Sequence, residues 1–300
     1  MEGLGSQLPV PSLSEPAPGV PLDSPKPAWP PWTAAGALLG GLVLAAVAGL
    51  IVDLPALALG VNVTASHVPG GLEIADTVVQ DAAFVAAALF FARLGGRTVE
   101  AWEFGLRPTP LWRAVWLLVA TLVGFLLFSF IWGSAFHAEK EKLLEQLGVG
   151  ESTILLVGSA ALTCVVAPIC EEFLFRGYVF TALRNWRGMW PAAIITGLAF
   201  GAVHVGSAPV VDLVPLAGLG FGLCLLYRYT GSLYPCIAAH SLNNCIAFGS
   251  LEGWGWQIPV LVFASLATIA LIALALMRVG LINPETPRAV LAPFTVAPGG

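Results

Sequence analysis

Two adjacent glutamates, Glu171 and Glu172, interrupt a long apolar stretch of the chain. Arg176 follows Glu172 by four positions, so the two share one face of a helix in the order that favours an ion pair. Glu171 points about 100° away around such a helix and has no local partner. Ionisable side chains near the centre of a bilayer cost roughly 2.5–3.5 kcal/mol each, so their presence needs a reason. Taken alone, the pattern fits a structural ion pair with a spare carboxylate as well as it fits a catalytic carboxylate.

Two further apolar segments contain histidines. One ends in Phe200-x-x-x-His204, and another contains His240 and Asn244, which are four residues apart and share a helix face. A lone histidine in an apolar segment is more often a packing residue than a catalyst. Counted at about 1.5 Å per residue from the nearest flanking arginine, Glu171, His204 and His240 lie about 20, 25 and 18 Å deep. Groups at one depth on three neighbouring helices can converge on one cavity, which favours a functional site.

The residue types in this set suit the hydrolysis of a peptide bond. Glu171 could act as a general base for a water molecule, and a neutral histidine could share or relay the proton. Asn244 can only donate or accept hydrogen bonds, which suits an oxyanion stabiliser. The chain has no HExxH or GxSxG motif and no pair of intramembrane aspartates for an aspartic dyad. Glu171, His204 and His240 could also bind a divalent metal ion such as zinc, although an asparagine ligand would be unusual.

The elements that hold these residues are expected to lie in a membrane. Of the 300 residues, 57% are hydrophobic and only 10% are charged, and the mean hydropathy is +0.85. A soluble domain carries about 25% charged residues, because its surface faces water. Charge is too scarce here to coat a globule of this size, so the lipid bilayer is the expected solvent. The net charge of -5, without a Lys/Arg cluster, argues against nucleic acid as a partner.

A helix needs roughly 20 apolar residues to cross a bilayer, because all its backbone groups must bond internally. We expect an all-α, polytopic transmembrane helical bundle of about eight spans, at residues 34–52, 74–92, 114–136, 152–183, 188–206, 210–227, 231–251 and 256–277. The second span is poorer, because it carries Asp76, Gln80 and Asp81 near one end. We predict four regions: a disordered Pro-rich tail (1–31), the N-terminal transmembrane helices (32–147), a protease-like core (148–282) and a second disordered tail (283–300).

The basic residues predict the orientation. With a cytoplasmic N-terminus, the cytoplasmic loops and span ends collect nine arginines: Arg93, Arg97, Arg107, Arg113, Arg184, Arg187, Arg228, Arg278 and Arg288. The opposite loops collect only Lys140 and Lys142. Because cytoplasmic loops carry an excess of Lys and Arg, we expect a multi-pass protein of the cell membrane with both termini in the cytoplasm.

Pro168 precedes Glu171 by three residues and cannot donate a backbone hydrogen bond. We expect the fourth span to bend or loosen there, which frees carbonyl groups to face a polar cavity. Such carbonyls are tolerated at membrane depth only where water or protein groups bond to them.

The three motifs occur in order, each within an expected span: Glu171-Glu172-x-x-x-Arg176, Phe200-x-x-x-His204 and His240-x-x-x-Asn244. Together they resemble the CPBP family of intramembrane proteases. This family includes the type 2 CAAX prenyl proteases and the bacterial Abi and bacteriocin-processing relatives. The resemblance covers roughly residues 150–250, about a third of the chain.

The resemblance implies that Glu171 and His204 activate a water molecule, and that His240 and Asn244 complete the site and help to stabilise the oxyanion. The second glutamate and the arginine of the first motif are implied to be a supporting pair. Both a metalloprotease and a glutamate-type endopeptidase fit the motifs. The implied partners are the lipid bilayer and a peptide or protein substrate at the membrane.

The predicted function is therefore an intramembrane endopeptidase that hydrolyses membrane-associated or lipid-anchored substrates with a water activated by Glu and His. Two other classes stay open. A non-catalytic membrane binding or immunity protein would use the polar cluster only to hold helices together, and a proton-coupled transporter would use the carboxylates for protons. The complete Glu/His/His/Asn set favours the enzyme, because a scaffold would need only the Glu172–Arg176 pair. The absence of an internal repeat counts against a repeat-built transporter.

Overall fold

A computed structural model describes residues 27, 29–61, 63, 68–136 and 146–283 of the chain. Within these ranges the fold is all-α, as predicted, and contains no strand. The α-helices are α1 (Trp32–Ala58), α2 (Gly70–Ala92), α3 (Leu111–Ala135), α5 (Thr153–Ala161), α6 (Ala167–Glu172), α7 (Thr181–Arg187), α8 (Met189–Ala202), α9 (Leu213–Thr230), α10 (Tyr234–Leu251) and α11 (Gln257–Arg278). Each of the eight expected spans corresponds to helical structure.

The fourth expected span is one continuous helical segment of 35 residues, Thr153–Arg187. Two π-helical stretches divide it into α5, α6 and α7. They are the first π segment (Leu162–Val166) and the second π segment (Phe173–Phe180). Short 3-10 turns at Ala101–Phe104 and Val210–Asp212 precede α3 and α9.

Six helical segments of the described chain are long and apolar enough to cross a membrane: Trp32–Ala58, Gly70–Ala92, Leu111–Ala135, Thr153–Arg187, Val210–Thr230 and Gln257–Arg278. Two predicted spans fall outside this set. α8 has only 14 residues and ends at Ala202, before a turn in which Gly206 adopts a φ of 100°. α10 has 18 residues, but His240, Asn243 and Asn244 make it more polar than the other spans.

The outer surface of the bundle is apolar. In each of α1, α3 and α11, only 11% of the most apolar stretch is buried inside the protein. Their exposed side chains include large ones such as Ile51, Phe130 and Phe263. An apolar surface of this extent is stable in lipid rather than in water. The chain is therefore an integral membrane protein.

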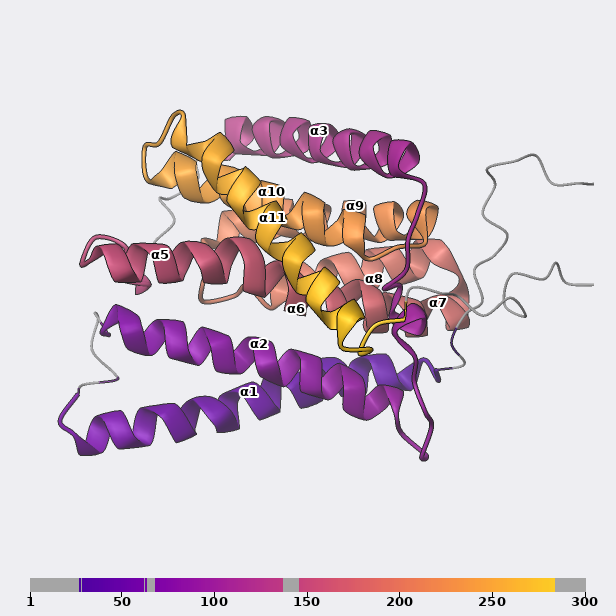
Figure 1. The fold of residues 1–300 in the computed structure, drawn as a ribbon, viewed down its shortest axis with the longest axis horizontal. Helices are drawn as coiled ribbons and strands as arrows, with labels where there is room; N and C mark the ends of the chain where they lie inside the picture. The colour runs from indigo at the N-terminus through magenta and orange to yellow at the C-terminus, as the bar shows by residue number, and fades with distance from the viewer. Residues whose placement is uncertain (1–26, 28, 62, 64–67, 137–145, 284–300) are drawn as a thin grey trace, which may run out of the picture.

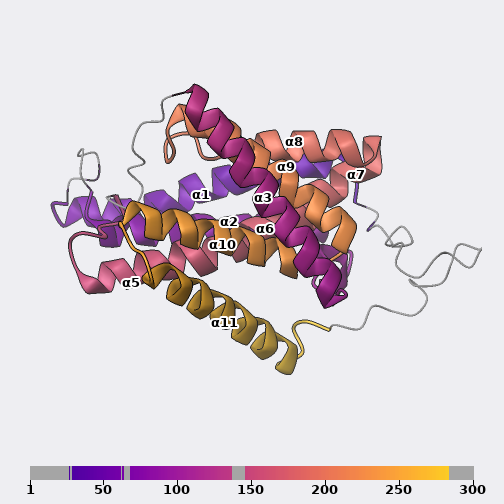
Figure 2. The same cartoon turned by 90° about the horizontal axis from the view of Figure 1, so that it is seen from above.

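The helices lie side by side, with α1 and α2 forming an antiparallel hairpin along one edge (Figure 1). α8 packs against α9, and α9 packs against α3. α11 contacts α10 and runs obliquely away from it, as Figure 2 shows. α6 contacts both α2 and α10. α6, which carries Glu171 and Glu172, thus lies between α2 of the hairpin and α10.

Two glycines allow α8 to approach α9 closely. A Cβ atom at Gly201 would lie 2.5 Å from the carbonyl oxygen of Leu213, and one at Gly197 would lie 2.8 Å from that of Ala217. Small residues four apart are a common means of packing helices in lipid, where no hydrophobic force drives them together. This contact fixes the end of α8 and the turn after it, which carries His204.

Gly201→Ala is expected to destabilise the protein by about 1–3 kcal/mol, because the added methyl group overpacks the α8–α9 contact. Gly124→Ala on α3 is the matched control, since a Cβ atom there would meet nothing within 4 Å. Alanine also favours a helix over glycine by about 1 kcal/mol. Thermal unfolding in detergent measures both variants, and equal midpoints would contradict this packing.

The expected loosening of the fourth span is present beside Pro168, the second residue of α6, where the chain leaves the first π segment. Two carbonyl groups of that segment accept side-chain donors from α10. Ser241 Oγ donates to the Cys164 carbonyl at 2.6 Å, and Asn244 Nδ2 donates to the Thr163 carbonyl at 2.9 Å. The prediction is confirmed, and protein groups satisfy the carbonyls of the loosened turn.

Ser241→Ala removes one of these donors and leaves the buried Cys164 carbonyl without its side-chain partner. We expect a loss of about 1–3 kcal/mol in stability, the usual cost of an unsatisfied buried polar group. Ser250→Ala, at an exposed position of the same helix, should change little. The comparison is made by thermal unfolding in one detergent. A Ser241→Ala protein as stable as Ser250→Ala would show that the bond to the loosened turn is dispensable.

The described arginines other than Arg176 lie at one end of the bundle, beside helix ends or in the loops between them: Arg93, Arg97, Arg107, Arg113, Arg184, Arg187, Arg228 and Arg278. The start of α1 and the end of α11 lie at this end too (Figure 1). We call it the arginine end. The arrangement agrees with the predicted topology, in which this end faces the cytoplasm, and the orientation itself stays a prediction.

Ordered structure begins earlier than the predicted tail boundary at residue 31. Trp29 is buried, and its ring centre lies 4.7 Å from that of Tyr178. The Asn185 Nδ2 atom donates to the Trp29 carbonyl at 3.2 Å. An aromatic side chain with this much contact anchors the chain just before α1. The rest of the two expected tails, 1–31 and 283–300, lies almost entirely outside the described residues.

Candidate active site

A buried ion pair lies at the centre of the bundle. Arg176 Nη1 donates to Glu172 Oε1 at 2.6 Å, and both side chains are fully buried. Arg176 Nη2 donates to the Gly220 carbonyl on α9 at 3.0 Å. The guanidinium carbon also lies 4.5 Å from the centre of the Phe200 ring on α8, a favourable cation–π distance. The predicted pair is therefore present, and it connects the second π segment to α8 and α9.

His240 is held by the same pair. Its Nδ1 atom lies 2.9 Å from Glu172 Oε1. An ionised carboxylate can only accept, so Nδ1 carries the hydrogen, and in the neutral ring Nε2 keeps its lone pair. Nε2 lies 3.9 Å from Glu171 Oε2. Glu172 thus orients the imidazole so that its second nitrogen faces Glu171.

His204 is oriented by its own helix turn. Its Nδ1 atom lies 2.7 Å from the Phe200 carbonyl, four residues earlier. A carbonyl also only accepts, so Nδ1 donates and Nε2 has the free lone pair in the neutral ring. The Phe200 ring centre lies 5.0 Å from that of His204 and 5.5 Å from that of His240. Phe200 therefore sets the spacing of the two histidines as well as covering Arg176.

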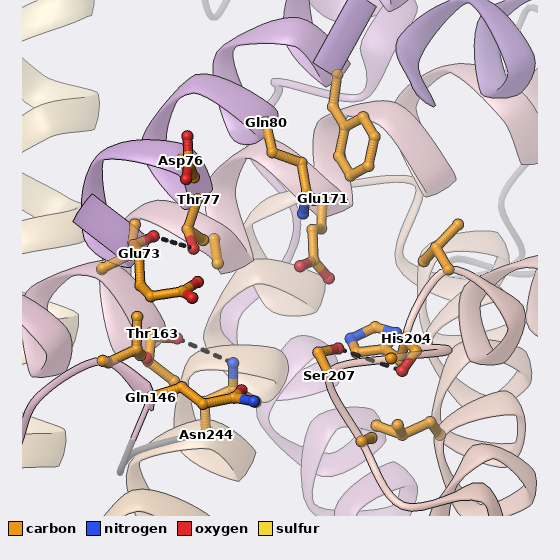
Figure 3. Close-up of a pocket in the computed structure, with 18 of the residues that line it drawn as sticks. Glu73, Asp76, Thr77, Gln80, Gln146, Thr163, Glu171, His204, Ser207 and Asn244 are labelled. Atoms are coloured by element: carbon orange, nitrogen blue, oxygen red, sulfur yellow. Dashed lines mark hydrogen bonds between the residues drawn. The ribbon is translucent and has the colours of Figure 1, made fainter. Parts of the chain in front are cut away.

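Glu171 is the motif carboxylate that faces open space. Its side chain is 13% exposed and lines a cavity of about 700 Å³. Figure 3 shows the carboxylate pointing into this cavity, on the side of the loop that carries His204. Glu171 Oε2 has no hydrogen-bond partner among the described residues. That oxygen is buried beside His240, whereas the rest of the side chain is partly exposed, so the carboxylate can take a proton from a water molecule in the cavity.

Asn244 lines the same cavity from α10. Its Nδ2 atom donates to the Thr163 carbonyl at 2.9 Å, and its Oδ1 atom accepts from Asn243 Nδ2 at 3.2 Å. An amide group has two N–H donors, so one of them stays available after the bond to Thr163. The neighbouring bonds fix which side of the amide is nitrogen, which matters for an oxyanion stabiliser.

The structure thus brings all four predicted catalytic residues to one cavity: Glu171, His204, His240 and Asn244. They come from α6, from the turn after α8 and from α10. Glu172 and Arg176 do not line the cavity and are buried behind it, a position that suits supporting residues. The placement is an observation, and the catalytic roles stay predictions.

Several cavity residues were not predicted as part of the site. Asn243 and Gln146 line the cavity, and so do Glu73, Asp76 and Gln80 on α2. The sequence did contain a signal for α2, because its polar residues weaken a predicted span. Polar residues in an otherwise apolar span are themselves a reason to expect a cavity beside it.

The structure does not group the predicted metal candidates Glu171, His204 and His240 as a set of metal ligands, and metal binding stays a prediction. Within the described ranges, no three His, Cys, Asp or Glu side chains are grouped so that they could hold a metal ion. Catalytic zinc sites use three protein ligands. We therefore derive no step that uses a metal ion.

The fold and the site define a class: a polytopic helical membrane protein with carboxylate, imidazole and amide groups around a cavity within the bundle. Comparisons with known proteins agree with this class. Residues 153–246 match a family model described as "Type II CAAX prenyl endopeptidase Rce1-like". The matched segment contains all three motifs. The resemblance to the CPBP family of intramembrane proteases is thereby confirmed.

Two curated proteins are similar to part of the chain. A Mycoplasma capricolum subsp. capricolum protein named "Uncharacterized protein" is 33% identical over 95 residues, which is 31% of this chain and 27% of that protein. A Bacillus subtilis protein named "Putative membrane peptidase YdiL" is 34% identical over 80 residues, 27% of this chain and 32% of that protein. The chain thus spans only about three tenths of the length of these relatives. No solved structure matches the chain. At family level, the similarity is to membrane proteases.

Proposed function

We propose that this protein is an intramembrane endopeptidase that hydrolyses peptide bonds of membrane-associated or lipid-anchored substrates. One observation carries the proposal: three motifs contribute side chains to one cavity, where the partly exposed Glu171 carboxylate lies beside His240. The similarity to membrane proteases at family level supports the same class.

The proposed reaction uses a water molecule in the cavity. Glu171 takes a proton from this water while the water oxygen bonds to the carbonyl carbon of the scissile peptide. The carbonyl electron pair moves onto its oxygen and gives an oxyanion. When the oxyanion collapses, the C–N bond breaks and the proton held by Glu171 passes to the leaving nitrogen. The products are a carboxylic acid and an amine, and Glu171 returns to its starting state.

The remaining cavity groups orient the water and stabilise charge. While Glu171 takes one hydrogen of the water, the Nε2 atom of either His204 or His240 can accept a hydrogen bond from the other, because both Nδ1 atoms are already donors. The second amide N–H of Asn244 can donate to the oxyanion. Removing a single donor of this kind typically raises the free energy of the transition state by about 2.7–4 kcal/mol.

The geometry favours the enzyme over a scaffold. In a scaffold, the polar groups would be paired between helices, as Glu172 and His240 are. The described partner of His204 Nδ1 is the carbonyl of Phe200 in the preceding turn, so this bond connects no second helix. A transporter would also need polar groups that continue to the far side of the bundle. The cavity lining contains no residue of the arginine end.

The proposal is tested by comparing membrane peptides from cells that produce the wild-type protein or Glu171→Gln, using mass spectrometry. Glutamine keeps the size of the side chain and removes the base. Peptide ends that appear only with the wild-type protein are the expected result. Identical peptide sets, with both proteins inserted at equal levels, would contradict an endopeptidase.

A further inference from the structure

The cavity reaches only one end of the bundle. Its lining includes Glu73 in the first turn of α2, Leu251 at the end of α10 and the turn 203–208 after α8. These three helix ends all lie opposite the arginine end (Figure 1). Ser207 is exposed and lines the cavity beside His204, as Figure 3 shows. Among the described residues, the cavity therefore opens to the surface at this end, which we call the open end.

Packed side chains close the cavity toward the arginine end. Between Glu171 and the arginine end, the second π segment contributes Leu174, Phe175 and Tyr178, all with no exposed surface. Glu171 precedes Arg187 by 16 residues on one helical segment, a distance of about 24 Å along the axis. Most of the roughly 30 Å hydrocarbon core would thus lie between the arginine end and Glu171.

The two ends differ in charge. Carboxylates gather at the open end, where the described ranges contain no Lys or Arg: Asp53, Glu73, Asp76, Glu151, Asp212 and Glu252. Arg and Lys residues mark the cytoplasmic side of multi-pass membrane proteins. By this rule, the arginine end is predicted to be the cytoplasmic end, and the open end is predicted to face outward.

We infer that the cavity opens on the extracytoplasmic side, so that the substrate is a polypeptide segment at the outer face of the membrane. The identity of the cavity as a substrate site rests on the proposed function, whereas the direction of its opening does not. A peptide bond at the cytoplasmic surface would be separated from Glu171 by the packed half of the bundle. A lipid-anchored tail on the cytoplasmic side is therefore not the expected substrate.

Cysteine labelling tests the direction without any substrate. Ser207→Cys places a thiol at the open end, and Arg187→Cys places one at the arginine end, where the side chain is exposed. In spheroplasts treated with a membrane-impermeant maleimide, Ser207→Cys should be labelled equally before and after permeabilisation. Arg187→Cys should be labelled only after permeabilisation. The wild-type protein gives the background, because four of its cysteines are buried and Cys170 is partly buried.

Labelling of Arg187→Cys in unpermeabilised spheroplasts would overturn the inference, as would protection of Ser207→Cys there. Val205→Cys, at a position 67% exposed in the same turn, repeats the test if Ser207→Cys does not accumulate.

A second measurement tests on which side of the membrane the substrate is cleaved. Cleavage sites that depend on Glu171 in the peptide comparison should map to the extracytoplasmic half of membrane proteins, and sites in cytoplasmic tails would overturn the inference. A lack of any Glu171-dependent site contradicts the proposed function instead, so the two failures are distinguishable.

Discussion

Replacing Arg176 by alanine is expected to cost about 3–5 kcal/mol of stability, the usual effect of removing one partner of a buried ion pair. Glu172 would then be a buried carboxylate that keeps, among the described residues, the bond from His240. Its Oε2 atom already has no hydrogen-bond partner among the described residues. The Gly220 carbonyl would lose the donor from Arg176, and the Phe200 ring would lose its cation. Thermal unfolding in detergent, together with the amount of protein in the membrane, measures the loss.

Arg187→Ala is the matched control, because Arg187 is exposed and its guanidinium group stacks on Trp186 at 5.0 Å. We expect this variant to unfold close to the wild-type midpoint. The unfolding midpoint of Arg176→Lys should fall between those of the two alanine variants. A lysine restores the charge but cannot reproduce the planar guanidinium that bonds to both Glu172 and the Gly220 carbonyl. If Arg176→Ala and Arg187→Ala unfold at the same temperature, the buried pair does not support the fold.

Glu171→Gln should lower turnover by about 10²–10⁴-fold, the range expected for a general base, while the protein stays folded. The carboxylate lines the cavity and its Oε2 atom has no hydrogen-bond partner among the described residues, so the amide should be accommodated without a lost contact. The measurement compares cleavage with the unfolding midpoint in one preparation. Glu73→Gln is the control, because Glu73 lines the same cavity on α2 but belongs to none of the three motifs.

Alanine variants of the two histidines should differ when cleavage and the unfolding midpoint are measured together. His204→Ala is expected to lose turnover with little loss of stability, because its Nδ1 atom bonds to the carbonyl of Phe200 in the preceding turn. His240→Ala should lose both, since His240 is buried and contacts Glu172. A His204→Ala protein that is unstable but cleaves normally per folded molecule would make His204 a packing residue.

The fold and the motif residues could be predicted from the sequence because lipid imposes strong constraints. Apolar runs with few charges predict spanning helices, and all eight expected segments are helical. Two of the expected spans, α8 and α10, do not have the length and apolar character expected of a spanning helix. The end of α8 depends on a turn at Gly206, and α10 is polar because it faces the cavity and the loosened turn.

The cavity could not be predicted from the sequence, because its shape depends on how helices far apart in the chain pack together. Spacing along a helix predicted the Glu172–Arg176 pair, because that contact is local. The bonds from Arg176 to Gly220 and from Asn244 to Thr163 join residues far apart in the sequence, and no spacing rule predicts them. The effect of Pro168 was predictable, since a missing donor must free an acceptor somewhere nearby.

Hydrolysis in water enriched in ¹⁸O tests the central claim most directly. The purified wild-type protein is placed in liposomes with a membrane protein substrate found by the peptide comparison, and the products are weighed by mass spectrometry. If Glu171 activates water, the new carboxyl group carries the heavy oxygen in the wild-type reaction, and folded Glu171→Gln gives almost no product. Labelled product formed at the wild-type rate by Glu171→Gln would contradict the assignment of this cavity as the active site.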